Sequence, residues 1–232
     1  MAFPETRLSL LEGLKSGDQE TRDRALDLLV RAYRAPVLAD LVWRWGLEPA
    51  DAEDLVQDFF AMAMEKGWFD RFEPARGRFR TFVRMAAQRY ASNWHEAAAR
   101  LRRGGGAAFV EASDATVPGI DGDLEADRRF REEWVRNILG LALEAFRAEA
   151  IGKDRQVHFA LFESYDLLDA AERPTYTQLG RIHSLGDSEV INHLAWARRR
   201  FRFHVLEVLR RLAGNEAEYR EDVRDLFGVD VS

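Results

Sequence analysis

Cysteine is absent from the 232 residues of this chain, and long hydrophobic runs are missing as well. Without a thiol there are no disulfides, no thiolate zinc sites and no cysteine nucleophile. No stretch approaches the roughly 18 apolar residues that a membrane-spanning helix needs. The first residues carry an early acid and lead into no apolar segment of the secretory type. These absences predict a cytoplasmic protein that is not inserted into a membrane.

Strand-like alternation of polar and apolar residues is also lacking, and apolar residues recur instead every three or four positions. This spacing predicts an all-α protein with helices along most of the chain. Pro36 lies inside one helical pattern and is expected to kink or interrupt that helix. The triple glycine at residues 104–106 is expected to stop another.

The stretch after the triple glycine is rich in Gly, Ala and Asp and poor in large apolar residues, which is typical of a linker. We therefore expect a first domain over residues 1–103, a flexible linker over 104–124 and a second domain over 125–213. Residues 214–232 form an acidic C-terminal extension.

The net charge of −6 hides two basic blocks. Residues 76–103 hold eight basic residues and one acidic residue, net +7, and residues 172–213 hold eight and four, net +4. Residues 214–232 hold two basic and six acidic residues, net −4. Because a local basic block attracts a phosphate backbone, nucleic acid is a candidate partner of both blocks.

The first basic block interleaves arginines with aromatic residues. Arginines bind phosphates, and aromatic rings stack on unpaired bases. Phe79, Phe82 and Tyr90 share the spacing of a buried face, whereas Asn93 and Trp94 are expected to face outward. The alternative is an amphipathic helix with solvated arginines and no nucleic-acid contact.

The second basic block contains the apolar spacing of a helix-turn-helix, whose second helix would enter a major groove. This spacing is carried by Leu179, Ile182, Leu185, Val190 and Leu194. An ordinary helical hairpin is the alternative. It is favoured by Gly180, which costs about 1 kcal/mol relative to alanine within a helix. Asp187 and Glu189 favour it too, because carboxylates repel phosphates.

Patterns of catalysis and of metal binding are weak in this sequence. The five histidines show no metal-ligand spacing with nearby carboxylates. A calcium-loop pattern begins at Asp121, but Ala126 stands where such a loop needs glycine. No Ser-His-Asp arrangement is evident. We therefore predict a protein that is not an enzyme and has neither cofactor nor metal.

The order of these segments is more specific than any one of them. The elements that carry it are Gly17-Asp18, Ala25, Leu28, Tyr33, Gly46, the Asp51-Ala52-Glu53-Asp54-Leu55 run, Gln57, Phe59, Phe60, Arg78-Phe79-Arg80, the linker and the C-terminal helix-turn-helix. Over about residues 8–213 this series resembles a bacterial extracytoplasmic-function (ECF) sigma factor of the sigma-70 superfamily. The triple glycine and the helix with Phe130 and Trp134 resemble a particular subgroup of that class.

The resemblance implies a sigma region 2 type domain, a linker and a region 4 type helix-turn-helix domain. It implies a transcription initiation factor that binds core RNA polymerase, through the beta-prime clamp and the beta flap, and opens specific promoter DNA. An anti-sigma factor is a further partner of such proteins. The polymerase-binding role would fall to Asp51, Glu53, Asp54, Gln57 and Asp58.

The same resemblance implies two groups of DNA-contacting residues. The basic helix would recognise and melt the promoter element near the start site by capturing flipped bases. Its residues would be Arg80, Arg84, Gln88, Arg89, Asn93 and Trp94. The helix-turn-helix would read the distal element through Asp187, Ser188, Glu189, Ile191, Asn192 and His193, with Arg198, Arg199, Arg200 and Arg202 on the DNA backbone.

Several positions of the helix-turn-helix depart from the family pattern. Ser184 stands where glycine is usual, Glu189 and Ile191 stand where basic or small residues are usual, and Trp196 takes a place often basic in the subgroup. One alternative is therefore a sigma-like regulatory protein that binds polymerase or a regulator without specific DNA recognition. Another is a helical scaffold with no nucleic-acid role. The acidic extension is either regulatory or a plain capping helix, and its sequence favours the second.

Overall fold

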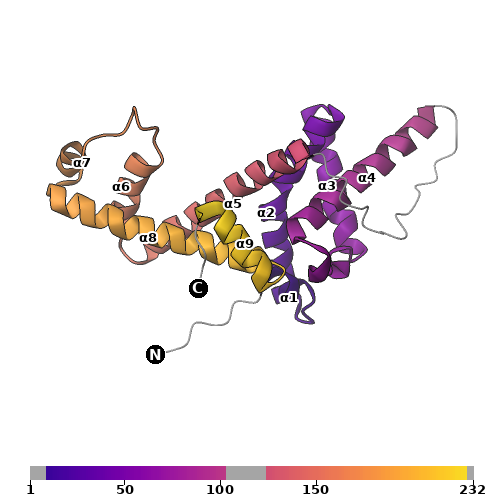
Figure 1. Cartoon of the computed structure of the whole chain (residues 1–232), viewed down its shortest axis with the longest axis horizontal. Helices are drawn as coiled ribbons and strands as arrows, with labels where there is room; N and C mark the ends of the chain where they lie inside the picture. The colour runs from indigo at the N-terminus through magenta and orange to yellow at the C-terminus, as the bar shows by residue number, and fades with distance from the viewer. Residues whose placement is uncertain (1–8, 103–123, 229–232) are drawn as a thin grey trace. The chain divides into compact units, whose positions relative to one another are not determined.

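The computed structural model describes residues 9–102 and 124–228, and these residues form helices and turns without a strand (Figure 1). The expected linker, apart from residue 124, lies outside the described residues. The helices are α1 (Leu10–Leu14), α2 (Gln19–Trp45), α3 (Pro49–Glu65), α4 (Phe79–Arg102), α5 (Leu124–Gly152), α6 (Gln156–Asp166), α7 (Tyr176–His183), α8 (Asp187–Leu212) and α9 (Glu216–Phe227), with short 3-10 turns at Phe69–Arg71 and Pro74–Arg76. The predicted all-α fold class is confirmed.

The helices group into two compact units. Of the described residues, 9–102, 124–137 and 210–228 belong to unit 1, and 138–209 belong to unit 2. The expected division assigned 125–137 to the second domain and 214–232 to a separate extension. In the structure residues 125–137 and 214–228 group with unit 1, where carboxylates of both segments contact the basic helix α4.

Unit 1 has an aromatic core built by α2, α3 and α4. Tyr33, Phe59 and Phe79 are fully buried. The ring centroid of Phe79 lies 5.7 Å from that of Tyr33 and 5.1 Å from that of Phe72, both edge-on. Edge-to-face pairs of this kind add to the stabilisation from burial alone. The core fixes the start of α4, which follows directly on Phe72 and the second 3-10 turn.

The helix α5 contributes to both units because of the spacing of its buried residues. Every fourth residue is buried, in the series Ala126, Phe130, Trp134, Ile138, Ala142, Phe146 and Ala150. Four residues advance about 400° around a helix, so the stripe rotates by about 40° at each step. The early members pack within unit 1 and the late members within unit 2. The buried residues of α5 therefore contribute to the core of each unit.

Pro36 does not interrupt α2, which is continuous from Gln19 to Trp45. Proline has no N–H, so the carbonyl of Ala32, one turn earlier, loses its helical partner. The side-chain amide of Asn137, on α5, donates to this carbonyl at 2.9 Å and to that of Arg31 at 2.6 Å. The helix α5 therefore supplies the hydrogen bond that the proline removes.

Unit 2 packs α6 and α7 against parts of α5 and α8. Phe146 is at the centre of one cluster, with its ring edge-on to Phe159 at 5.3 Å and to Phe162 at 5.5 Å. A second cluster consists of Leu161, Leu179, Val190 and Leu194. Ile182, expected in this core, is 71% exposed, because α7 buries only its Leu179–Gly180 side.

The Asn137 contact gives a first testable prediction. Asn137→Ala should lower the free energy of unfolding by about 1 kcal/mol, because the Ala32 carbonyl loses its donor. In a Pro36→Ala background residue 36 regains an N–H for this carbonyl, so the cost should be smaller. Urea unfolding of the four proteins measures both costs. Equal costs in the two backgrounds would contradict the proposed pairing.

Candidate nucleic-acid interface

The helix α3 presents an acidic stripe. Pro49 occupies its first turn, where a missing N–H costs nothing, and Asp51 lies at the positive end of the helix dipole. The opposite side of the helix is buried against the core, through Ala52, Leu55, Val56, Phe59, Phe60 and Ala63. Asp51, Asp54 and Asp58 recur at helical spacing and are exposed, as is Gln57. These four residues are the acidic stripe.

Glu53 differs from the other predicted polymerase-binding residues. It is half-buried and forms an ion pair with Arg34 of α2. Its carboxylate therefore helps to attach α3 to α2, and the other four predicted residues retain an open surface.

The helix α4 buries two of its arginines. Arg80 is 8% exposed and Arg84 is 5% exposed, and Phe79, Val83 and Ala87 of the same helix are buried as well. A desolvated guanidinium needs a partner charge. Arg84 forms an ion pair with Asp127, at the start of α5.

Arg80 has partners on two other helices. It forms an ion pair with Asp222 of α9, and its guanidinium carbon lies 5.0 Å from the ring centroid of Trp134 on α5. Gln88, half-buried on α4, donates to Asp40 of α2 at 2.9 Å. Three of the six predicted melting residues, Arg80, Arg84 and Gln88, are thus directed to groups of the same chain.

The other three predicted melting residues, Arg89, Asn93 and Trp94, lie in the second half of α4 and are half-exposed. The ring of Trp94 is edge-on to His95 at 5.0 Å, and His95 stacks on Trp45 of α2 at 4.4 Å. Aromatic and basic side chains therefore gather beside one another here, as an interface with unpaired bases requires.

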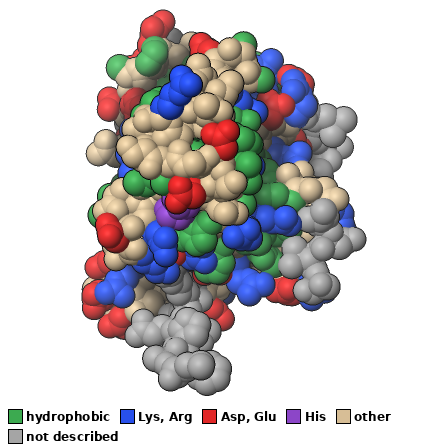
Figure 2. Space-filling model, turned by 90° about the vertical axis from the view of Figure 1, so that its left-hand side faces the viewer, with side chains coloured by type: hydrophobic (Ala, Val, Ile, Leu, Met, Phe, Trp, Pro, Cys, Tyr) green, Lys and Arg blue, Asp and Glu red, His purple; other side chains and the backbone are tan. Residues whose placement is uncertain are grey.

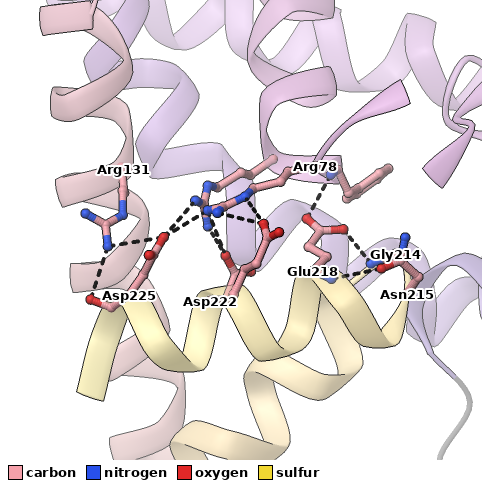
Figure 3. Close-up of polar contacts among 10 residues, drawn as sticks. Arg78, Arg131, Gly214, Asn215, Glu218, Asp222 and Asp225 are labelled. Atoms are coloured by element: carbon pink, nitrogen blue, oxygen red, sulfur yellow. Dashed lines mark hydrogen bonds and ion pairs between the residues drawn. The ribbon is translucent and has the colours of Figure 1, made fainter. Parts of the chain in front are cut away.

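At the first turn of α4, basic residues face the acidic helix α9 (Figure 3). We call this group the α9 cluster: Arg78, Arg80 and Arg131 with Glu218, Glu221, Asp222 and Asp225. Arg78 donates to Glu221 at 3.0 Å and to Asp225 at 2.9 Å, and lies 3.4 Å from Asp222. Arg131 of α5 lies 3.5 Å from Asp225 and donates to its carbonyl at 3.2 Å.

Glu218 lies at the buried end of the α9 cluster. Its two carboxyl oxygens accept from the N–H groups of Phe79 and Gly214, each at 2.8 Å. Burial raises the pKa of Glu218 to about 7, although these N–H groups oppose the rise and the neighbouring Asp222 adds to it. Burial also raises the pKa of Asp222, against the effect of Arg78. The α9 cluster as a whole contains four carboxyl groups and three guanidinium groups.

In unit 2, α7 and α8 are joined by a tight turn that depends on Gly180. The N–H of Leu185 donates to the carbonyl of Gly180 at 2.8 Å. A Cβ at Gly180 would lie 2.5 Å from the carbonyl oxygen of Leu185. The glycine, which the sequence suggested as a sign of an ordinary hairpin, is therefore required by close approach at the turn. Ser184 adopts a left-handed conformation with φ +56°, where glycine would be free of strain.

The two acids at the start of α8 stabilise this turn. Thr177 donates to Asp187 at 2.9 Å, and the N–H of Gly186 donates to the Glu189 carboxylate at 2.8 Å. The second contact has the geometry of a helix N-terminal cap. Both carboxylates, predicted to read DNA bases, thus have partners within the turn.

Of the other predicted base-reading residues, Ser188, Ile191 and Asn192 are exposed. His193 is half-buried, and its ring centroid lies 3.9 Å from that of His158 on α6. The structure therefore leaves three neighbouring side chains of α8 open to a partner.

Among the arginines that follow, Arg198 lies 3.0 Å from Asp166 of α6 and Arg200 lies 2.7 Å from Glu149 of α5. Arg198, Arg199 and Arg202 are exposed, and Arg200 is half-buried. Partial burial acts to raise the pKa of Glu149, but hydrogen bonds from Lys153, Arg200 and His204 lower it to about 2.

Acidic, basic and hydrophobic side chains are intermingled on the face drawn in Figure 2.

Within residues 9–102 and 124–228, no three His, Asp or Glu side chains are grouped so that they could hold a metal ion. Over the same ranges, no helix combines the length and the apolar character needed to cross a membrane.

Residues 29–101, from the middle of α2 to the end of α4, match the Sigma-70 region 2 family. This is a family of non-enzymatic transcription factors that act in transcription initiation and bind polymerase, and the match covers less than a third of the chain. Comparison with curated proteins and with solved structures finds no match.

The sequence analysis missed the carboxylates that cover α4. Glu218, Asp222 and Asp225 recur at helical spacing along the acidic extension, and Asp127 begins the helix after the linker. The opposite net charges of residues 76–103 and 214–232 could have been used to predict that the acidic extension contacts α4.

Two glycines allow a matched test of the turn. Gly180→Ala should destabilise unit 2, because the added Cβ meets the Leu185 carbonyl, although alanine is the better helix former. Gly140→Ala, on α5, places its Cβ in open space and should stabilise the protein by about 1 kcal/mol. Thermal unfolding measures both changes. A gain in stability from Gly180→Ala would show that the turn is looser than described.

The raised pKa of Glu218 predicts a pH dependence of stability. The ordinary pKa of this group is 4.5, so between about pH 4.5 and 7 the native state holds a proton that the unfolded chain releases. This contribution is fully present below pH 4.5 and is lost as the pH rises through 7, on the order of 2 kcal/mol. Glu218→Gln should therefore lose less stability than the wild type between pH 5 and 8.

Urea unfolding at several pH values measures this difference. Glu216→Gln, at an exposed carboxylate of α9 paired with Arg220, is the control and should keep the wild-type slope. Identical slopes for wild type and Glu218→Gln would contradict the assignment.

Proposed function

We propose that this protein is a transcription initiation factor of the ECF class, which binds core RNA polymerase and directs it to specific promoters. The observation that carries the proposal is the Sigma-70 region 2 match, because residues 29–101 include both the acidic stripe of α3 and all the half-exposed residues of α4 considered above. A cytoplasmic location follows from this role, since polymerase and promoter DNA are there.

The acidic stripe is the proposed surface for the beta-prime clamp of the polymerase. Asp51, Asp54, Gln57 and Asp58 are exposed on one side of α3, and the core behind them holds the helix in place. A rigid row of carboxylates is suited to a basic partner helix and would speed association at low salt. Glu53 supports this surface through its contact with Arg34.

The second half of α4 is the proposed site of promoter opening. Arg89 would contact phosphates, and Asn93 and Trp94 would receive bases that leave the duplex, by hydrogen bonding and stacking. His95 and Trp45 support Trp94 from behind. No covalent chemistry is needed, since unstacked bases are bound and not altered.

Unit 2 is the proposed reader of the distal promoter element, through a helix-turn-helix formed by α7 and α8. Its base contacts would come from Ser188, Ile191 and Asn192, and Arg199 and Arg202 would contact the DNA backbone. The beta flap of the polymerase would contact the same unit. An anti-sigma factor is a further partner in this proposal.

A second candidate function is a sigma-like regulator that binds polymerase without reading specific DNA. The observation that favours it is that Asp187, Glu189, Arg198 and Arg200, four of the ten predicted contacts of unit 2, already have partners within that unit. Pull-down with core polymerase followed by run-off transcription on a genomic library separates the two. Specific transcripts support the initiation factor, binding without transcripts supports the regulator, and absence of binding refutes both.

Charge reversal on the acidic stripe tests the polymerase contact. Asp51→Arg with Asp54→Arg should abolish binding to core polymerase while the protein stays folded, because both side chains are exposed. Asp23→Arg with Asp27→Arg is the matched control, with the same change in charge at exposed positions of α2. A pull-down with each folded variant gives the result. Normal binding by the α3 variant, or equal loss in both, would refute the assignment.

A further inference from the structure

The helix α9 is attached to unit 1 closely and at several points. Tyr219 and Val223 are buried beside the two buried carboxyl groups of the same helix. Gly214, just before α9, has no side chain where a Cβ would lie 2.7 Å from the Phe72 ring. Asn215 caps the helix by accepting from the N–H of Glu218. The chain is thus shaped to bring one acidic side of α9 against the start of α4.

The groups that α9 occupies on α4 are those that would bind a phosphate. Arg78 and Arg80 supply two guanidinium groups, and Phe79 supplies the first backbone N–H of the helix. Guanidinium groups and N–H groups at a helix N-terminus are the usual donors to phosphate oxygens. In the structure each of them has a carboxyl group of α9 as its partner (Figure 3).

Stability alone is a weak reason for this arrangement. The side chains of Arg80 and Asp222 are 9% and 3% exposed. Desolvation of a buried ion pair cancels much of its attraction, so such pairs are poor sources of net stability. The α9 cluster also holds four carboxyl groups against three guanidinium groups, which adds repulsion. An apolar α9 would be the simpler way to cap the core.

We propose that α9 is an autoinhibitory helix whose carboxyl groups take the place of nucleic-acid phosphates on Arg78 and Arg80. The proposal rests on the proposed function of α4 as a DNA-contacting helix. DNA and α9 then compete for the same donors. By linkage, DNA binding weakens the attachment of α9 by the same factor by which α9 weakens DNA binding.

The test uses two variants that loosen α9 by different means. Asp222→Asn with Asp225→Asn removes two charges from the α9 cluster and leaves the apolar contacts in place. Gly214→Ala changes no charge and pushes α9 away from Phe72. Glu216→Gln and Gly140→Ala are the matched controls, because both change residues that lie outside the α9 cluster. Circular dichroism and thermal unfolding show that each full-length protein is folded.

Binding is measured by fluorescence anisotropy with a labelled 20-nucleotide single strand of mixed sequence, from 50 to 200 mM salt. Release of two arginines should steepen the log-log salt slope by about 1.4, at about 0.7 per phosphate contact on a single strand. The gain in affinity, roughly ten-fold at 50 mM salt, should therefore shrink about seven-fold by 200 mM. The controls should match the wild type.

A second measurement detects the movement of α9 in the otherwise unchanged protein. Because the chain has no cysteine, spin labels at Ala75→Cys and Ala217→Cys attach only there. Both positions are exposed, one before α4 and one on α9. Addition of the single strand should replace one narrow distance distribution by a longer and broader one.

The outcomes separate this inference from the proposed function. Tighter binding with a steeper slope in both variants supports autoinhibition. If both variants are folded and bind as the wild type does, α9 is a permanent cap and the inference is overturned. Arg89→Ala and Trp94→Ala, added to the loosened variants, should weaken binding. If they do not, α4 is not the DNA-contacting helix, and the proposed function of α4 fails together with the inference.

Discussion

The buried arginines of α4 impose the constraint on which unit 1 depends. A guanidinium group cannot leave water without a partner charge, and α4 carries two such groups on its core side. One partner comes from α5, the next helix along the chain, and the other from α9 near residue 222. Asp127 comes from α5 and Asp222 from α9, so the acidic residues that neutralise α4 also bring parts of these two helices into unit 1. These two ion pairs explain why unit 1 includes the start of α5 and the helix α9.

The same constraint changes the meaning of the basic block at residues 76–103. Its net charge of +7 describes the segment in isolation. In the folded protein the first half of α4 faces carboxyl groups, and the half-exposed residues proposed to contact DNA lie in the second half. While α9 is attached, the surface of α4 that is open to DNA is therefore smaller and lies further along the helix than the charge pattern alone indicates. The acidic stripe of α3 is unaffected, because its residues face away from the core.

Patterns within short stretches of the sequence predicted the helices well. They could not predict which residues far apart in the sequence form ion pairs. Apolar spacing identified Phe79 and Tyr90 as buried residues of α4, because helix periodicity follows directly from which side is packed. It could not show that Arg80 and Arg84 are buried, since arginine within a basic helix ordinarily remains solvated. Nor could it reveal that Ile182 is exposed, because a helix as short as α7 buries only about one turn. The role of Gly180 in the turn was not evident either, because it depends on a carbonyl five residues later.

The attachment of α9 has a consequence for synthesis on the ribosome. Arg80 and Asp222 are separated by 142 positions in the chain. The helices matched by the region 2 family are complete long before the residues of α9 have been made. For that interval the nascent chain presents a basic, incompletely neutralised surface, in a compartment filled with ribosomal RNA. Contacts between residues so far apart in sequence also form slowly. The helix α9 thus joins unit 1 only after the helices of residues 29–101 have been translated.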